Sequence, residues 1–173
     1  MSIFVSLSDN RLKLGSICTN IQSGQAGFIP FKDGKEGDRK TPLGQYYLRF
    51  GLYRADRLPS PPPVNTQNPL IFRPLRPDDG WCDDPAHLAY NRFIKRPFTA
   101  SHEALWRNDG AYDIILVMSH NDSPPEAGLG SAVFIHIAQP DLRPTLGCIA
   151  LTPNDMCAIL PLLKRGMAIH ITA

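Results

Sequence analysis

The 173-residue sequence has no long apolar run, no block of like charges and no pair of cysteines at C-x-x-C spacing. No apolar stretch approaches the roughly 20 residues that cross a bilayer as a helix. The 18 basic and 16 acidic residues are interspersed and leave a formal charge of +2, so no basic surface for nucleic acid is indicated. We therefore expect neither a membrane nor a nucleic acid as a partner.

Cysteine is scarce as well, with four residues at Cys18, Cys82, Cys148 and Cys157. Their spacing argues against a disulfide framework or a zinc ribbon. The N-terminal segment also lacks the basic start, apolar core and small-residue cleavage site of a secretory signal. If the sequence is the complete chain, we expect a cytoplasmic protein with free thiols. If a leader was removed, a periplasmic location is expected instead.

The length fits a single domain over residues 1–173, without internal repeats or low-complexity tracts. Residues 2–7 and 11–17 alternate around a turn at 8–10, which predicts a β-hairpin. Further apolar or alternating segments predict additional strands at 28–31, 45–53, 112–119, 131–138, 148–151 and 167–172. This pattern favours a mainly β fold, a sandwich or barrel-like sheet with one or two short helices.

Two segments are predicted to form those helices. Ser101 is a capping residue for a short helix over 101–107. Thr152 is followed by a proline and then by an acidic residue at Asp155, which predicts a second helix start. Pro161 should kink or shorten this second helix.

Prolines crowd residues 59–98 and exclude long helices and central strands there. Since the segment also contains aromatic residues, we expect an ordered loop draped over one face of the sheet rather than a disordered region. Trp81 and Tyr90, with the neighbouring Asp83, Asp84 and Asn91, are candidates for the wall of a binding groove. Turn formation and core packing explain them equally well.

A histidine and a glycine-preceded cysteine lie close together in the segments Val133-Phe-Ile-His-Ile-Ala138 and Thr145-Leu-Gly-Cys-Ile-Ala150. A thiol beside an imidazole becomes a nucleophile for acyl transfer, since the imidazole can take its proton. Alternation along the first segment places His136 on one face with Phe134 and Ala138. A core histidine and an inert buried thiol are the alternatives. The backbone N–H groups of Leu146, Gly147 and Cys148 would form the oxyanion site.

Other polar residues near these segments have competing interpretations. His120, Asn121 and Asp122 follow an apolar strand and could bind a substrate carboxylate or simply form a turn. Together with His136, they also contain the two histidines and one carboxylate of a zinc hydrolase, although without H-E-x-x-H spacing. Arg143 could bind a carboxylate or lie in solvent.

The chain resembles the L,D-transpeptidase (YkuD-like) catalytic-domain family, whose signature is a histidine followed by Ser/Thr-x-Gly-Cys and a hydrophobic residue. The matching residues here are His136 and Thr145-Leu-Gly-Cys-Ile149. Leu146 and Ala150 replace a histidine and an arginine that many members carry, so the chain resembles a divergent branch. Further family-like segments are Lys35-Glu-Gly-Asp-Arg-Lys-Thr-Pro-Leu-Gly44, Asp78-Asp-Gly-Trp-Cys-Asp-Asp-Pro85, Tyr90-Asn-Arg92 and Ser101-His-Glu-Ala-Leu-Trp106.

This resemblance implies a cysteine enzyme that acts on peptidoglycan stem peptides, with Cys148 as nucleophile, His136 as base and no cofactor. Hydrolysis would make it an L,D-carboxypeptidase that releases D-alanine from muropeptide tetrapeptides. Transfer to an amine would make it an L,D-transpeptidase, and loss of activity would leave a peptide-binding module. For a chain without an export signal we expect hydrolysis.

Overall fold

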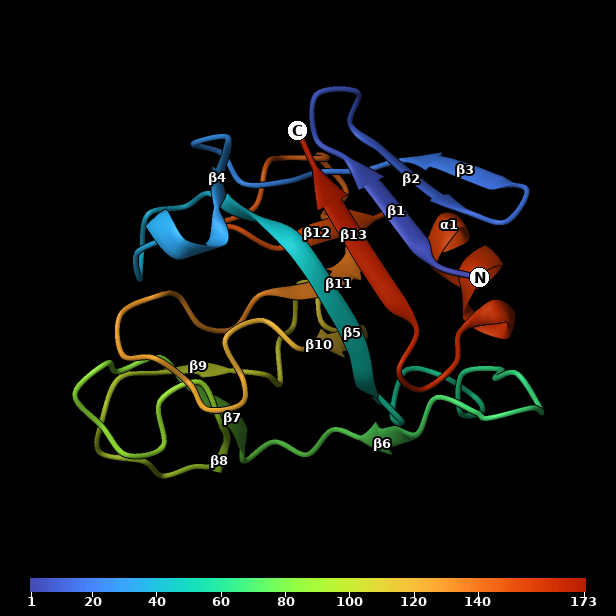
Figure 1. The fold of residues 1–173 in the computed structure, drawn as a ribbon. Coiled ribbons are helices and arrows are strands. Elements are labelled where there is room, and N and C mark those ends of the chain that lie inside the picture. The colour runs from blue at the N-terminus through green and yellow to red at the C-terminus, as the bar shows by residue number, and fades with distance from the viewer.

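The computed structural model describes residues 1–173, and a ten-stranded, barrel-like sheet dominates the fold (Figure 1). Eight strands lie in the order β12-β11-β10-β5-β13-β1-β2-β3, and β4 and β6 both pair with β5. Their bounds are β1 (Ile3–Ser6), β2 (Arg11–Leu14), β3 (Ile17–Asn20), β4 (Phe28–Pro30), β5 (Thr41–Tyr53), β6 (Phe72–Pro74), β10 (Ile114–Met118), β11 (Phe134–Ile137), β12 (Ile149–Leu151) and β13 (Ala168–Thr172). The predicted mainly β fold and its N-terminal hairpin are confirmed.

A second, three-stranded sheet is formed by β7 (Asp79–Cys82), β8 (Phe93–Lys95) and β9 (His102–Ala104), with β7 in the centre. The prediction of a helix over 101–107 is wrong, because β9 pairs antiparallel with β7. A helix of this length is marginal without tertiary support, whereas the strand satisfies its backbone groups across the ladder. The Pro-rich segment is likewise less irregular than expected, since it contains β6, β7 and β8.

The one α-helix, α1 (Pro153–Ile159), begins where the sequence predicts. The Thr152 hydroxyl accepts a hydrogen bond from the Asp155 N–H at 3.2 Å and caps the first turn. The helix passes into the 3₁₀ turn η2 (Leu160–Leu162) at Pro161, which confirms the predicted shortening. The other 3₁₀ turn, η1, covers Phe31–Asp33. No helix has the length and apolar character needed to cross a membrane.

Alternate residues of the central strands face two separate apolar cores. On β10, Ile114 and Leu116 belong to a core of 23 buried residues, while Ile115 and Val117 belong to a smaller core of nine. On β11, Phe134 packs in the smaller core, beneath the three-stranded sheet. His136 shares the face of Phe134, since side chains two residues apart point the same way. The strand therefore places this histidine at the border of the smaller core.

Candidate active site

A cavity of about 750 Å³ lies beside the smaller core and contains both His136 and Cys148 in its wall. Its volume falls in the range that small-molecule sites occupy. The other lining residues come from the segments around residues 25–39, 83, 103–112, 131–133 and 139–150. The cavity therefore gathers residues that are far apart in the sequence around one thiol and one imidazole.

Cys148 is held directly before β12, which pairs in parallel with β11. Its Sγ donates a hydrogen bond to the Ala132 carbonyl at 3.2 Å and accepts one from the Phe134 N–H at 3.3 Å. The Thr145 hydroxyl donates to the Cys148 carbonyl at 2.6 Å. These bonds fix the cysteine turn against the start of β11, on the side of the sheet where His136 lies.

Two features of the backbone require glycine at position 147. Its φ of +134° is in the region that favours glycine, and a Cβ at this position would lie 2.9 Å from the Lys40 carbonyl oxygen. Its N–H donates to the Thr145 hydroxyl at 3.1 Å, so it is already engaged. Of the three N–H groups expected from the sequence to form an oxyanion site, only those of Leu146 and Cys148 remain candidates.

His136 is oriented by the backbone of its own strand. Its Nδ1 lies 2.9 Å from the Ile137 carbonyl oxygen, and a carbonyl can only accept, so Nδ1 carries a proton. In the neutral ring, Nε2 is then the basic nitrogen. The edge of Tyr112 packs against the imidazole, with ring centroids 5.2 Å apart at 78°. Because only 8% of the residue is exposed, burial lowers the pKa of His136 below its usual value.

Burial disfavours the charged form of both the thiol and the imidazole. Burial, with a smaller contribution from the nearby Glu103 carboxylate, raises the pKa of Cys148 to about 12. The two directions oppose a resident thiolate–imidazolium pair, since each group disfavours its charged form. Nor does either group hydrogen-bond the other, because Sγ faces Ala132 and Nδ1 faces Ile137.

A network of charged and polar residues in the cavity wall was not predicted from the sequence. The Tyr112 hydroxyl donates to Glu103 at 2.6 Å, and Arg107 forms an ion pair with Asp109 at 2.5 Å. Burial raises the pKa of Glu103, whereas the bonds from Arg107 hold the pKa of Asp109 well below its usual value. Glu103 lies on β9, and the incorrect prediction of a helix over 101–107 gave no reason to place it in the cavity wall.

The sequence-predicted binding residues divide between this cavity and other places. Leu146 and Arg143 line the cavity with Gly147, while Trp81 and Tyr90 do not. Trp81 is a buried core residue whose Nε1 donates to Asn91 at 2.8 Å. The Tyr90 hydroxyl donates to Glu36 at 2.5 Å and accepts from the Gly130 N–H. Both aromatic residues thus act in packing and loop attachment.

The segment 120–122 also lies outside the main cavity. The buried Asn121 side chain donates to the carbonyls of Glu126 and Gly130, which fits the turn interpretation. Asp122 is paired with Arg49 at 2.7 Å. His120, Asp122 and His136 consequently do not come together as metal ligands, and no group of three potential ligands is present elsewhere.

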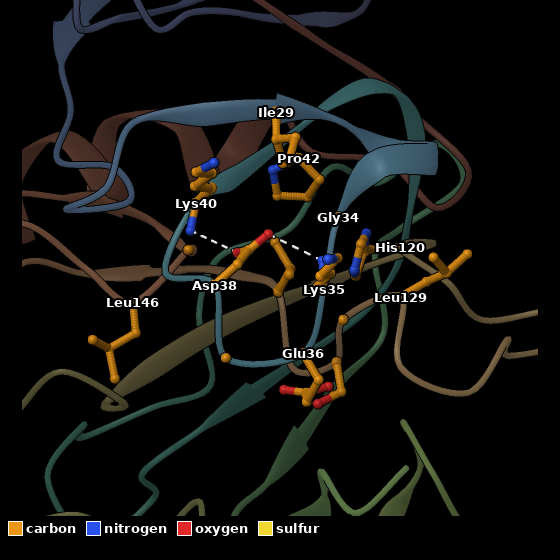
Figure 2. Close-up of a pocket in the computed structure, with 15 residues that line it drawn as sticks. Ile29, Gly34, Lys35, Glu36, Asp38, Lys40, Pro42, His120, Leu129 and Leu146 are labelled. Carbon is orange, nitrogen blue, oxygen red and sulfur yellow. Dashed lines mark hydrogen bonds between the residues drawn. The ribbon is translucent and has the colours of Figure 1, made fainter.

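His120 lines a second cavity of about 40 Å³, which we call the side cavity (Figure 2). Its wall contains residues of the 34–40 loop, residues 129–131, and Leu146 and Gly147. Figure 2 shows Asp38 in this loop, where its carboxylate accepts hydrogen bonds from the backbone N–H groups of Lys35 and Lys40 at 3.0 and 2.9 Å. The side cavity therefore adjoins the loop that precedes Cys148.

With the thiol and the imidazole placed in the wall of one cavity, the chain was compared with known proteins. The family model described as the L,D-transpeptidase catalytic domain (YkuD) matches residues 2–171. The chain therefore belongs to this family.

Among solved structures, L,D-transpeptidase 1 from Mycobacterium tuberculosis is similar, with 12% sequence identity and a TM-score of 0.44. The match covers 99% of this chain and 61% of that chain, so this protein spans less than two thirds of its neighbour's length. No curated protein matches the sequence.

Proposed function

We propose that this protein is an L,D-carboxypeptidase that removes terminal D-alanine from muropeptide tetrapeptides through a thioester on Cys148. The observation that carries the proposal is the presence of Cys148 and His136 in the wall of one ligand-sized cavity. The bond to Ile137 supports it, because this bond leaves Nε2 as the basic nitrogen of His136. Membership of the L,D-transpeptidase family supports stem peptides as the substrate class.

In the first half of the reaction, the Cys148 sulfur attacks the carbonyl of the L-configured third residue while His136 Nε2 takes the thiol proton. Charge develops on the carbonyl oxygen, and the N–H groups of Leu146 and Cys148 are free to stabilise it. The C–N bond then breaks, and His136 returns the proton to the amine of D-alanine. The thioester remains on Cys148.

In the second half, water attacks the thioester and releases the tripeptide. The side cavity favours water over an amine, because it brings a small polar space to Leu146 and Gly147. Arg143 lines the main cavity, and its guanidinium is mostly exposed, with only a 4.0 Å contact to Asp141. We assign it to a carboxylate of the stem peptide, since a guanidinium can bind a carboxylate through two parallel hydrogen bonds.

The test is incubation of the purified protein with a disaccharide tetrapeptide, followed by mass analysis. Release of D-alanine and tripeptide is expected. A cross-linked dimer or exchange of D-alanine for an added D-amino acid would identify a transpeptidase instead. An unchanged substrate would identify a binding module. Iodoacetamide should abolish turnover and a chelator should not, and the reverse result would overturn the thiol mechanism.

A further inference from the structure

Two residues that line the side cavity, His120 and Ser131, carry buried polar atoms without a hydrogen-bond partner in the protein. Both ring nitrogens of His120 are unpaired, although only 4% of the residue is exposed. The hydroxyl of Ser131, which lines the same cavity, is also unpaired. Since an unsatisfied buried polar group costs roughly 1–3 kcal/mol, two of them at one cavity point to a polar ligand.

The surrounding residues orient the His120 ring rather than bond to it. The rings of Phe31 and Tyr46 pack against His120 with centroid distances of 5.4 and 5.8 Å. At Gly130, a Cβ would lie 3.1 Å from His120 Nε2, so the absence of a side chain there keeps the space beside this nitrogen open. The ring is thus held by apolar contacts, and neither of its nitrogens has a hydrogen-bond partner in the protein.

The size of the side cavity decides what the ligand can be. Its volume is about 40 Å³. A water molecule needs about 10–15 Å³ by this measure, so the space accepts a few water molecules but no amino acid. Burial lowers the pKa of His120 to about 4, so the ring is neutral near pH 7. A neutral imidazole has one donor and one acceptor nitrogen, which suits water.

The side cavity and the main cavity share part of their walls. Ser131, Leu146 and Gly147 line both cavities, as do Glu36, Gly37 and Val133. Ser131 also precedes Ala132, whose carbonyl accepts the hydrogen bond from Cys148 Sγ. The side cavity therefore lies next to the loop that carries Cys148.

We propose that the side cavity binds the water molecule that hydrolyses the Cys148 thioester, and that His120 and Ser131 are its positioning residues. This inference rests on the proposed function. The water oxygen forms a bond to the acyl carbon, and the C–S bond breaks. One water proton passes through His136 to the sulfur, and the other stays on the new carboxyl group until that group ionises. No further reactant is required.

The experiment follows D-alanine release from the disaccharide tetrapeptide by rapid quench, together with the intact mass of the protein. His120→Phe keeps the aromatic contacts with Phe31 and Tyr46 and removes both nitrogens. His170→Phe is the matched control, because His170 stacks on Phe4 on β1, apart from both cavities. His120→Gln retains a donor and an acceptor.

For His120→Phe, we expect a first turnover that changes little and a steady-state rate that falls roughly 10- to 100-fold, because the attacking water loses its position. The acyl-enzyme should accumulate, and an added D-amino acid should capture a larger share of it. His120→Gln should recover part of the hydrolysis, and His170→Phe should match the wild type. If His120→Phe does not fold, Ser131→Ala is the second test. It should likewise slow hydrolysis of the acyl-enzyme and increase its capture by an added D-amino acid.

Two results would overturn the inference. In the first, His120→Phe slows the first turnover and the steady state equally. In the second, hydrolysis by His120→Phe and Ser131→Ala equals that of the wild type. Failure of the wild-type protein to release D-alanine would be a different outcome, because it would overturn the proposed function itself.

Discussion

The two adjoining cavities each have a buried histidine in their wall, but the two imidazole rings differ in their hydrogen bonds. In the main cavity, His136 has Nδ1 fixed by the Ile137 carbonyl and Tyr112 against its face, so a single nitrogen remains available. In the side cavity, His120 has neither nitrogen bonded and is held by apolar rings alone. A ring with one defined basic nitrogen suits proton transfer, whereas a ring with two open nitrogens suits a bound solvent molecule.

The largest expected effect is loss of the proposed nucleophile or base. Cys148→Ala and His136→Ala should each lower turnover of the tetrapeptide by about 10⁴-fold or more, because the two groups act as a unit. The measurement is the steady-state release of D-alanine. Cys157→Ala is the control, since this exposed thiol lies outside the cavity. If Cys148→Ala retained substantial turnover, the main cavity would no longer be distinguished from the side cavity as the place of the nucleophile.

Gly147→Ala should be the next most damaging change. The added Cβ would lie 2.9 Å from the Lys40 carbonyl oxygen, and alanine is strained at a φ of +134°. The displaced loop should lower kcat roughly 10²-fold, since a small misplacement of reacting groups has that effect. Gly27→Ala is a matched control with a positive φ and open space around its Cβ. Equal loss in both variants would show that backbone strain alone, and not the contact with Lys40, matters.

The pH dependence of kcat/KM sharpens the comparison, because the base must be neutral to accept a proton. Burial lowers the pKa of His136, so activity should persist as the pH falls below about 6.5 and be lost only under more acidic conditions. Since the pKa of Cys148 is raised to about 12, ionisation of the thiol should add no second limb to the profile near neutral pH. An acid limb centred above pH 6.5 would contradict a neutral, desolvated His136.

Protonation of His120 should affect the pH dependence of protein stability rather than the acid limb of kcat/KM. Its pKa is about 4 in the folded state and 6.5 when exposed, so the unfolded chain binds more protons between these values. Its contribution is complete above about pH 6.5 and is lost as the pH falls towards 4, on the order of 3 kcal/mol. Denaturant unfolding across this range should show the loss in the wild type and a flatter profile in His120→Phe. If the wild type and His120→Phe showed the same pH profile, the pH-dependent loss of stability could not be assigned to His120.

Local patterns in the sequence predicted the elements that support the nucleophile. Alternation along 131–138 correctly predicts the face of His136, and Thr152 with its proline marks the start of α1. The wall opposite the cysteine could not be predicted in the same way. Glu103 reaches the cavity through pairing of β9 with β7, which depends on a partner some 20 residues away in the chain.

The fate of two other candidates depended on neighbouring groups that compete for them. Asp122 was a candidate for binding substrate, but Arg49 on β5 pairs with it. The Gly147 N–H was a candidate oxyanion donor, but the Thr145 hydroxyl two residues earlier accepts its hydrogen bond. Residue type indicates which groups can do chemistry, whereas the competition among neighbours decides which of them remain free to do it.

The central claim is that Cys148 carries the acyl group of the stem peptide, and trapping that intermediate tests it most directly. The protein is mixed with the disaccharide tetrapeptide, quenched in acid within the first turnovers and mapped by peptide mass analysis. We predict an added mass equal to the substrate less D-alanine, located on the peptide that contains Cys148. Release of D-alanine with no acyl group on Cys148, or an acyl group on another residue, would contradict the account.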